Sequence, residues 1–106
     1  IHFDFDSRKI RPDQQKALAE NIKKAKDLAE KNKDIVVEGH ACHSAGSRVY
    51  NLAISGDRAR IVANELEKHG VKSKATGRGT DMPAVKGGDR QEQAPNRRAE
   101  IHAISK

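Results

Sequence analysis

The sequence predicts an α/β fold: a two-layer sandwich of βαβαβ-β type, with one mixed four-stranded sheet and both helices on one face. Segments with apolar residues at every second position alternate with segments whose apolar residues recur every three or four positions. Each helix has one apolar stripe, and two layers bury all stripes at once. With 106 residues there is room for one core, so we expect a single domain over 1–106.

The first strand is predicted at 1–6, where Ile1, Phe3 and Phe5 alternate with polar residues. Pro12 suits the first turn of a helix that continues to about residue 31. The apolar residues of this helix recur at helical spacing and are Leu18, Ile22, Ala25 and Leu28.

A short apolar run at 34–39 predicts a second strand, placed centrally in the sheet. The second helix is expected over about 55–69, with Ser55 as its cap and Gly70 at its end; residues 48–53 are expected to form only a preliminary turn. Its inward residues are Ala59, Val62 and Leu66, with Ile61 beside them.

Two weaker segments complete the sheet. Residues 72–77 predict a third strand, and alternation at 97–104 predicts the last. Between them, 77–95 is rich in Gly, Asp and Gln and predicts a long loop. Gly77-Arg78-Gly79 lacks the Lys-Ser/Thr end of a phosphate loop, so we interpret it as a turn.

Composition excludes several classes of function. The net charge is +6, but basic and acidic residues are interspersed and only three residues are aromatic, which argues against a nucleic-acid binder. No apolar run approaches the roughly 20 residues of a membrane span. The single cysteine excludes an internal disulfide. Because the chain starts directly at a strand, we expect a domain excised from a longer protein.

The polar stretch 38–58, between the second strand and the second helix, predicts a binding site. His40, Cys42 and His43 resemble metal ligands, but their spacing along an extended segment sends neighbours to opposite faces and no fourth ligand is placed. Nothing in the sequence fixes an activating triad for Cys42 either. We therefore predict no metal, no cofactor and no enzyme, and expect His40 to make structural hydrogen bonds at the strand end.

The arginines are better candidates. Arg58, near a helix start, has the bidentate fork that suits a carboxylate, and we expect it at a cavity mouth, where its truncation costs within about 0.5 kcal/mol. Arg97, in Asn96-Arg97-Arg98, either lies at a solvated strand entrance or brings another guanidinium to the site.

An ordered set of motifs resembles the OmpA-like C-terminal domain family over the whole chain. The motifs are Phe3-Asp4-Phe5-Asp6, Glu38-Gly39-His40-Ala41, Gly46-Ser47, Tyr50-Asn51, Ser55 with Arg58-Ala59, and Asn96-Arg97-Arg98-Ala99-Glu100-Ile101. The resemblance implies a periplasmic or cell-envelope protein. It also implies noncovalent binding of peptidoglycan through the diamino acid of the stem peptide.

The resemblance also implies site residues. Arg58 matches the arginine that takes the ligand carboxylate; Asn51 and Arg97 match further site positions, and Asp6 lies near the mouth. The aspartate that takes the ligand ammonium is replaced by Cys42 or, counted from the other side, by His43. We therefore expect weak or non-standard binding; the alternative is a diverged domain that serves as a protein-interaction or structural module.

Overall fold

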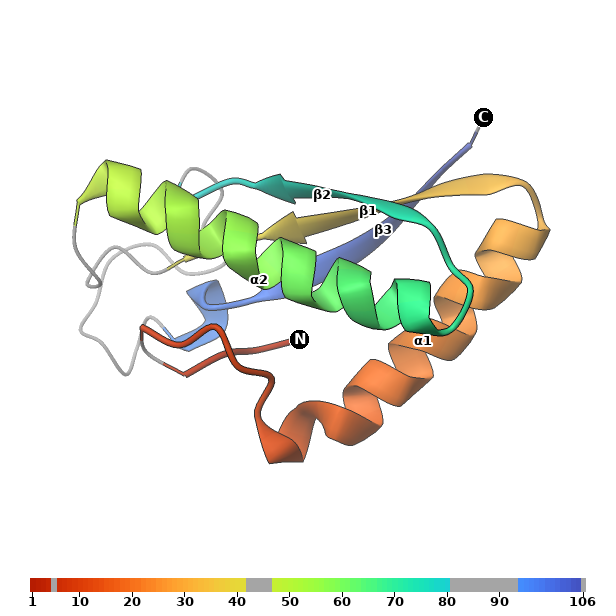
Figure 1. Cartoon of the computed structure of the whole chain (residues 1–106), viewed down its shortest axis with the longest axis horizontal. Helices are drawn as coiled ribbons and strands as arrows, with labels where there is room; N and C mark the ends of the chain where they lie inside the picture. Colours follow the sequence, from red (N-terminus) through yellow and green to blue (C-terminus); the bar gives the residue numbers. More distant parts are fainter. Residues whose placement is uncertain (5, 42–46, 81–93, 106) are drawn as a thin grey trace.

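The structure is a computed structural model that describes residues 1–4, 6–41, 47–80 and 94–105. It has an α/β fold with two helices and a three-stranded sheet (Figure 1). Neither described helix has the length and apolar content needed to cross a membrane. The elements in chain order are η1 (Pro12–Gln14), α1 (Gln15–Glu30), β1 (Lys33–Gly39), α2 (Arg48–Lys68), β2 (Ser73–Gly77), η3 (Ala94–Asn96) and β3 (Ala99–Ser105).

The sheet has the order β2-β1-β3, so β1 is the central strand, as its apolar run predicts. β1 pairs with β2 in parallel and with β3 antiparallel, which confirms a mixed sheet. The predicted fourth strand is wrong: within the described residues the sheet has three strands.

In the N-terminal segment, expected as a strand at 1–6, the described residues make one isolated antiparallel bridge, between His2 and Arg98. The segment is tied to the chain just before β3 by the hydrogen bond from Phe3 N to Arg97 O, at 2.7 Å. Asp6 has a φ of 53°, so the backbone turns there and cannot continue a ladder. Phe3 is nevertheless in the core, as its alternation predicts, whereas Phe5 lies outside the described residues.

One core joins the sheet and both helices. Ile35 and Val37 are buried and project from the same face of β1, since side chains alternate along a strand. The helical residues packed in the same core as these two confirm the predicted apolar stripes: Leu18, Ile22 and Ala25 of α1, and Ala59, Val62 and Leu66 of α2. α1 is followed by Asn32 and α2 by Gly70, both in the left-handed region with φ of 63° and 82°.

α2 begins earlier than its sequence predicts. Its cap is Ser47, whose Oγ accepts a hydrogen bond from Tyr50 N at 3.1 Å, and residues 48–53 form the first turns of the helix rather than a preliminary turn. Ser55 is a fully buried residue inside the helix. The apolar pattern misleads here because Val49 and Leu52 are exposed and the small pair Ser55-Gly56 resembles a helix start.

That small pair lies where α2 crosses the sheet. Gly39 of β1 is paired with Gly77 of β2, and the backbone of α2 lies directly over both. A Cβ on Gly39 would come within 1.7 Å of Ser55 O, and a Cβ on Gly77 within 2.6 Å of Gly56 N. Side chains at these two sheet positions would therefore lift the helix from the sheet.

Candidate functional site

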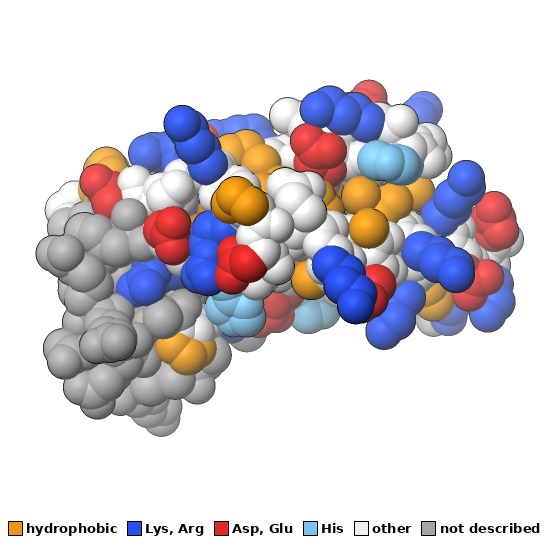
Figure 2. All heavy atoms as spheres, turned by 90° about the horizontal axis from the view of Figure 1, so that it is seen from below, with side chains coloured by type: hydrophobic (Ala, Val, Ile, Leu, Met, Phe, Trp, Pro, Cys, Tyr) orange, Lys and Arg blue, Asp and Glu red, His pale blue; other side chains and the backbone are white. Residues whose placement is uncertain are grey.

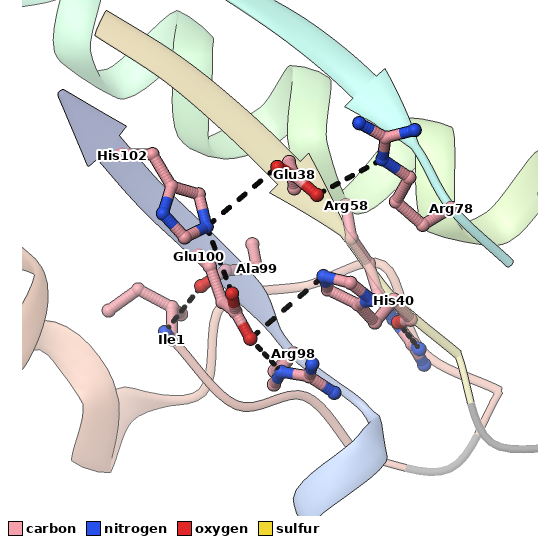
Figure 3. A network of polar contacts seen from close by, with 9 residues as sticks. All are labelled: Ile1, Glu38, His40, Arg58, Arg78, Arg98, Ala99, Glu100 and His102. Carbon is pink, nitrogen blue, oxygen red and sulfur yellow. Dashed lines mark hydrogen bonds and ion pairs between the residues drawn. The ribbon is translucent and has the colours of Figure 1, made fainter. Parts of the chain in front are cut away.

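Arg58 projects from α2 toward the sheet and is only 1% exposed. Its guanidinium donates three hydrogen bonds to backbone carbonyls: Nε to Ser7 O at 3.0 Å, Nη1 to His40 O at 2.9 Å and Nη2 to Asp4 O at 3.2 Å. The guanidinium carbon also lies 5.2 Å from the centroid of the Phe3 ring. One cation thus joins α2, the residue after β1 and the N-terminal segment (Figure 3 shows Arg58 beside His40).

Two other predicted residues, Arg97 and Asp6, lie at the same N-terminal segment. Arg97 is buried, and its Nε donates to Phe3 O at 3.1 Å. The carboxylate of Asp6, which is exposed, accepts a hydrogen bond from the hydroxyl of Tyr50 on α2. Arg58 and Arg97 therefore both bind backbone carbonyls of the N-terminal segment to which Asp6 belongs.

Asn51 is buried on α2, two helical turns before Arg58 and so on the same side of the helix. Cys42 and His43 lie outside the described residues. The chain leading to them is fixed beside the site, since Ala41 N donates to Gly79 O at 2.9 Å. Among the residues that the structure describes, no three His, Cys, Asp or Glu side chains are grouped as ligands for a metal ion.

The burial of Arg58 corrects one expectation. A residue at a cavity mouth would be exposed, and its truncation would hardly change stability. Arg58 is instead buried and donates to three carbonyls, so its loss would remove a charged donor from each of them, although Asp4 O keeps its bond from Ser7 N. The apolar neighbours of Arg58 on α2 predict this burial, because Ala59 and Val62 are inward and Arg58 lies beside them.

The turn predicted at Gly77-Arg78-Gly79 begins later than expected: Gly77 is the last residue of β2, and the chain turns at Gly79, which has a φ of 59°. Gly79 is buried, and its N–H donates to Ser55 Oγ at 2.8 Å. The Ser55 hydroxyl in turn donates to Leu52 O at 2.8 Å. Ser55 therefore binds this turn and, with Gly56, allows the close approach of α2 to the sheet.

A polar network on the other face of the sheet is missing from the sequence-based predictions (Figure 3). Glu38 of β1 pairs in register with Glu100 of β3, so two carboxylates lie side by side. Arg78 Nε binds Glu38 at 3.0 Å, Arg98 binds Glu100, and His102 Nε2 lies 2.9 Å from Glu100 Oε1. The alternation in 97–104 contains Arg98, Glu100 and His102, but only the register of β1 with β3 brings Glu100 beside Glu38.

His40 lies at the inner end of this network and is 2% exposed. Its backbone makes the predicted structural hydrogen bonds, including N to Arg98 O at 2.7 Å. Its ring nitrogens have no hydrogen-bond partner among the described residues, and Nε2 is 3.9 Å from Glu100 Oε2. Burial, followed by the charge of Arg98, lowers the pKa of His40.

The carboxyl of Glu100 responds to the same surroundings in its own way. Burial acts to raise its pKa, but the bonds from Arg98 and His102 outweigh burial and lower the pKa from its ordinary value. The folded state therefore favours a neutral His40 beside an ionised Glu100. Protonation of either group is therefore less favourable in the folded state than in the unfolded state, so low pH destabilises the fold.

His40 gives the fold a pH dependence with a defined sign. Because its pKa is lower when folded, the unfolded chain binds more protons below about pH 6.5, and the free energy of unfolding falls as pH drops through that range. In His40→Asn, urea unfolding at pH 7 and pH 5 should give a smaller difference than in the parent. Part of the dependence should remain, since burial also lowers the pKa of His2. An unchanged difference would contradict this account.

Arg58→Ala should lower the free energy of unfolding by about 2 to 4 kcal/mol, because three carbonyls lose a charged donor. Arg60→Ala is the matched control on the same helix. Arg60 is exposed and binds Asp57 in a surface ion pair, so its loss should cost within about 0.5 kcal/mol. Equal effects in urea titrations of the two variants would show that the contacts of Arg58 contribute little.

Comparison with known proteins identifies the family. The model of the OmpA family matches residues 2–97. The peptidoglycan-associated lipoprotein of Pseudomonas aeruginosa is 34% identical over 95% of this chain and 60% of its own length, so the chain spans about three fifths of this relative. This relative and the cell wall anchor described below are proteins of the cell envelope, which confirms the predicted location.

Two solved structures are similar to the fold described above. The peptidoglycan-associated lipoprotein of Burkholderia pseudomallei has a TM-score of 0.83 and 29% identity, covering 97% of this chain and 87% of the other. The cell wall anchor of the T6SS from Pseudomonas aeruginosa has a TM-score of 0.74 and 25% identity, covering 99% and 76%. Since the family model covers residues 2–97, which is most of the sequence, the chain belongs to the OmpA family.

Proposed function

We propose that this chain is a peptidoglycan-binding module of a bacterial cell-envelope protein, with an altered pocket for the diamino acid of the stem peptide. The observation that carries the proposal is Arg58, which takes the position of the family arginine. Its guanidinium is held at the junction of α2, the end of β1 and the N-terminal segment. The names of the relatives, a peptidoglycan-associated lipoprotein and a cell wall anchor, support the same function.

The pocket would bind the carboxylate end of the diamino acid through fixed positive charge. The guanidinium of Arg58 is immobilised by its carbonyl partners, and Arg97 is a second buried guanidinium beside the same segment. A carboxylate entering next to these groups would form charge-assisted hydrogen bonds without first ordering a flexible side chain. Asn51 would face the ligand from α2, and Asp6 would lie at the mouth.

The ammonium end of the ligand is where the pocket differs from the family pattern. The aspartate position is taken by Cys42 or His43, and a thiol and an imidazole carry no fixed negative charge at neutral pH. A charge-assisted hydrogen bond contributes on the order of 1.5 to 3 kcal/mol, so its loss would weaken binding by roughly ten- to a hundredfold. We therefore propose weak binding of a diaminopimelate-type stem peptide.

One observation favours a second candidate, a diverged domain that acts as a protein-interaction or structural module. The guanidinium of Arg58 already holds three backbone carbonyls and would be retained for the fold even without a ligand. A pulldown with purified cell-wall sacculi separates the candidates. Retention that persists in added salt supports peptidoglycan binding, whereas retention that salt removes reflects the charge of +6 alone.

Calorimetry with a defined diaminopimelate muropeptide measures how much affinity is lost with the missing negative charge. The parent should bind weakly, and either Cys42→Asp or His43→Asp should bind more tightly because the carboxylate restores an acceptor for the ammonium. Cys42→Ser and His43→Asn are matched neutral controls and should give no gain. Tight binding by the parent would show that another residue supplies the negative end. No gain in either aspartate variant would show that the pocket itself has been lost.

A further inference from the structure

A groove lies between α1 and the C-terminal end of α2, away from the site around Arg58. Its volume is about 510 Å³. Lys68, on its α2 side, is ten residues after Arg58, which corresponds to about 15 Å along a helix. The lining residues are Ala19, Ile22, Lys23 and Lys26 of α1, with Lys68 and His69 at the end of α2.

The floor of the groove is apolar. Ile22 belongs to the core, and Ala19, one turn before it, is exposed. Figure 2 shows this side of the molecule, with hydrophobic side chains in a strip and Lys, Arg and His side chains along its margins, interspersed with Asp and Glu. An apolar strip bounded by polar groups at a helix pair is suited to a side chain of a docked segment.

The walls of the groove are basic. Lys23 and Lys26 make no ion pair with an acid among the described residues, whereas Lys68 is paired with Glu65 at 3.1 Å. His69 Nδ1 lies 2.9 Å from Glu65 O. The lining of the groove thus contains three lysines and no acid, although Glu20 and Asp27 lie near Lys23 on the outer side of α1. The lining itself therefore carries an excess of positive charge that a ligand could neutralise.

We propose that this groove docks an acidic segment of another protein. An apolar side chain of that segment would pack on Ala19 and Ile22, and its carboxylates would pair with Lys23 and Lys26. A free phosphate group would make no use of the apolar floor, and lysines lack the planar fork that suits bidentate phosphate binding. A lipid surface is flat, whereas these residues line a hollow. This docking surface is independent of stem-peptide binding at the other site.

The test uses short fluorescein-labelled peptides and anisotropy at low and moderate salt. A peptide of interspersed Glu and Leu should bind the parent, and an all-Glu peptide of equal length should bind more weakly because nothing fills the floor. Lys23→Glu/Lys26→Glu should weaken the Glu/Leu peptide about tenfold or more. Lys16→Glu/Lys24→Glu changes the net charge equally on the same helix but outside the groove, and should weaken it less than about threefold.

A further variant tests the floor without changing charge. Ala19→Trp should fill the groove and reduce binding of the Glu/Leu peptide, while circular dichroism shows that the fold is kept, since Ala19 is exposed. Equal binding of both peptides, or equal losses in the two double variants, would overturn the proposal in favour of simple charge attraction. Binding of anionic phospholipid vesicles without binding of the peptide would overturn it in favour of a membrane contact.

Discussion

The close approach of α2 to the sheet is the constraint on which the rest of the structure depends. Gly39 and Gly77 face each other in neighbouring strands, and the backbone at Ser55 and Gly56 lies against both. No other residue type could occupy Gly39 at this separation, because its Cβ would overlap Ser55 O. Arg58 follows within one turn. The contact that positions α2 on the sheet therefore also places the guanidinium of Arg58 at the end of β1.

Burying that guanidinium is favourable only because its charge is well solvated by protein groups. An isolated buried cation would be strongly destabilising, but carbonyl oxygens of Asp4, Ser7 and His40 replace water around Arg58. The arrangement makes one residue serve both the fold and the proposed site. It also explains how a ligand group could be recognised by a side chain that needs no reordering on binding.

Much of this architecture follows from the sequence. The spacing of Leu18, Ile22 and Ala25 predicts α1 and its inner face, and the apolar run at 34–39 predicts the central strand. These patterns arise because one face of a single helix or strand is buried, and the spacing of apolar residues in the sequence indicates that face directly. The ordered motifs predict the family for the same reason, since they are properties of the chain itself.

The differences arise where tertiary contacts override local pattern. Ser55 and Gly56 resemble a helix start, yet they are small because the sheet lies against them. The alternation of residues 1–6 predicts a strand, but the described part of this segment makes one bridge, at His2, and its backbone turns at Asp6. The burial of Arg58 and the approach of Glu38 to Glu100 depend on helix placement and strand register, which no single segment encodes.

The most direct test of this account compares alanine at two glycines by urea unfolding. Gly39→Ala should lower the free energy of unfolding by about 3 kcal/mol or prevent folding, because its Cβ meets the α2 backbone. Gly56→Ala adds a Cβ that meets only the flexible end of Arg60, at 3.3 Å, and should be neutral or stabilise α2 by up to about 1 kcal/mol. A Gly39→Ala variant as stable as the parent would contradict the claim that close seating of α2 holds the structure together.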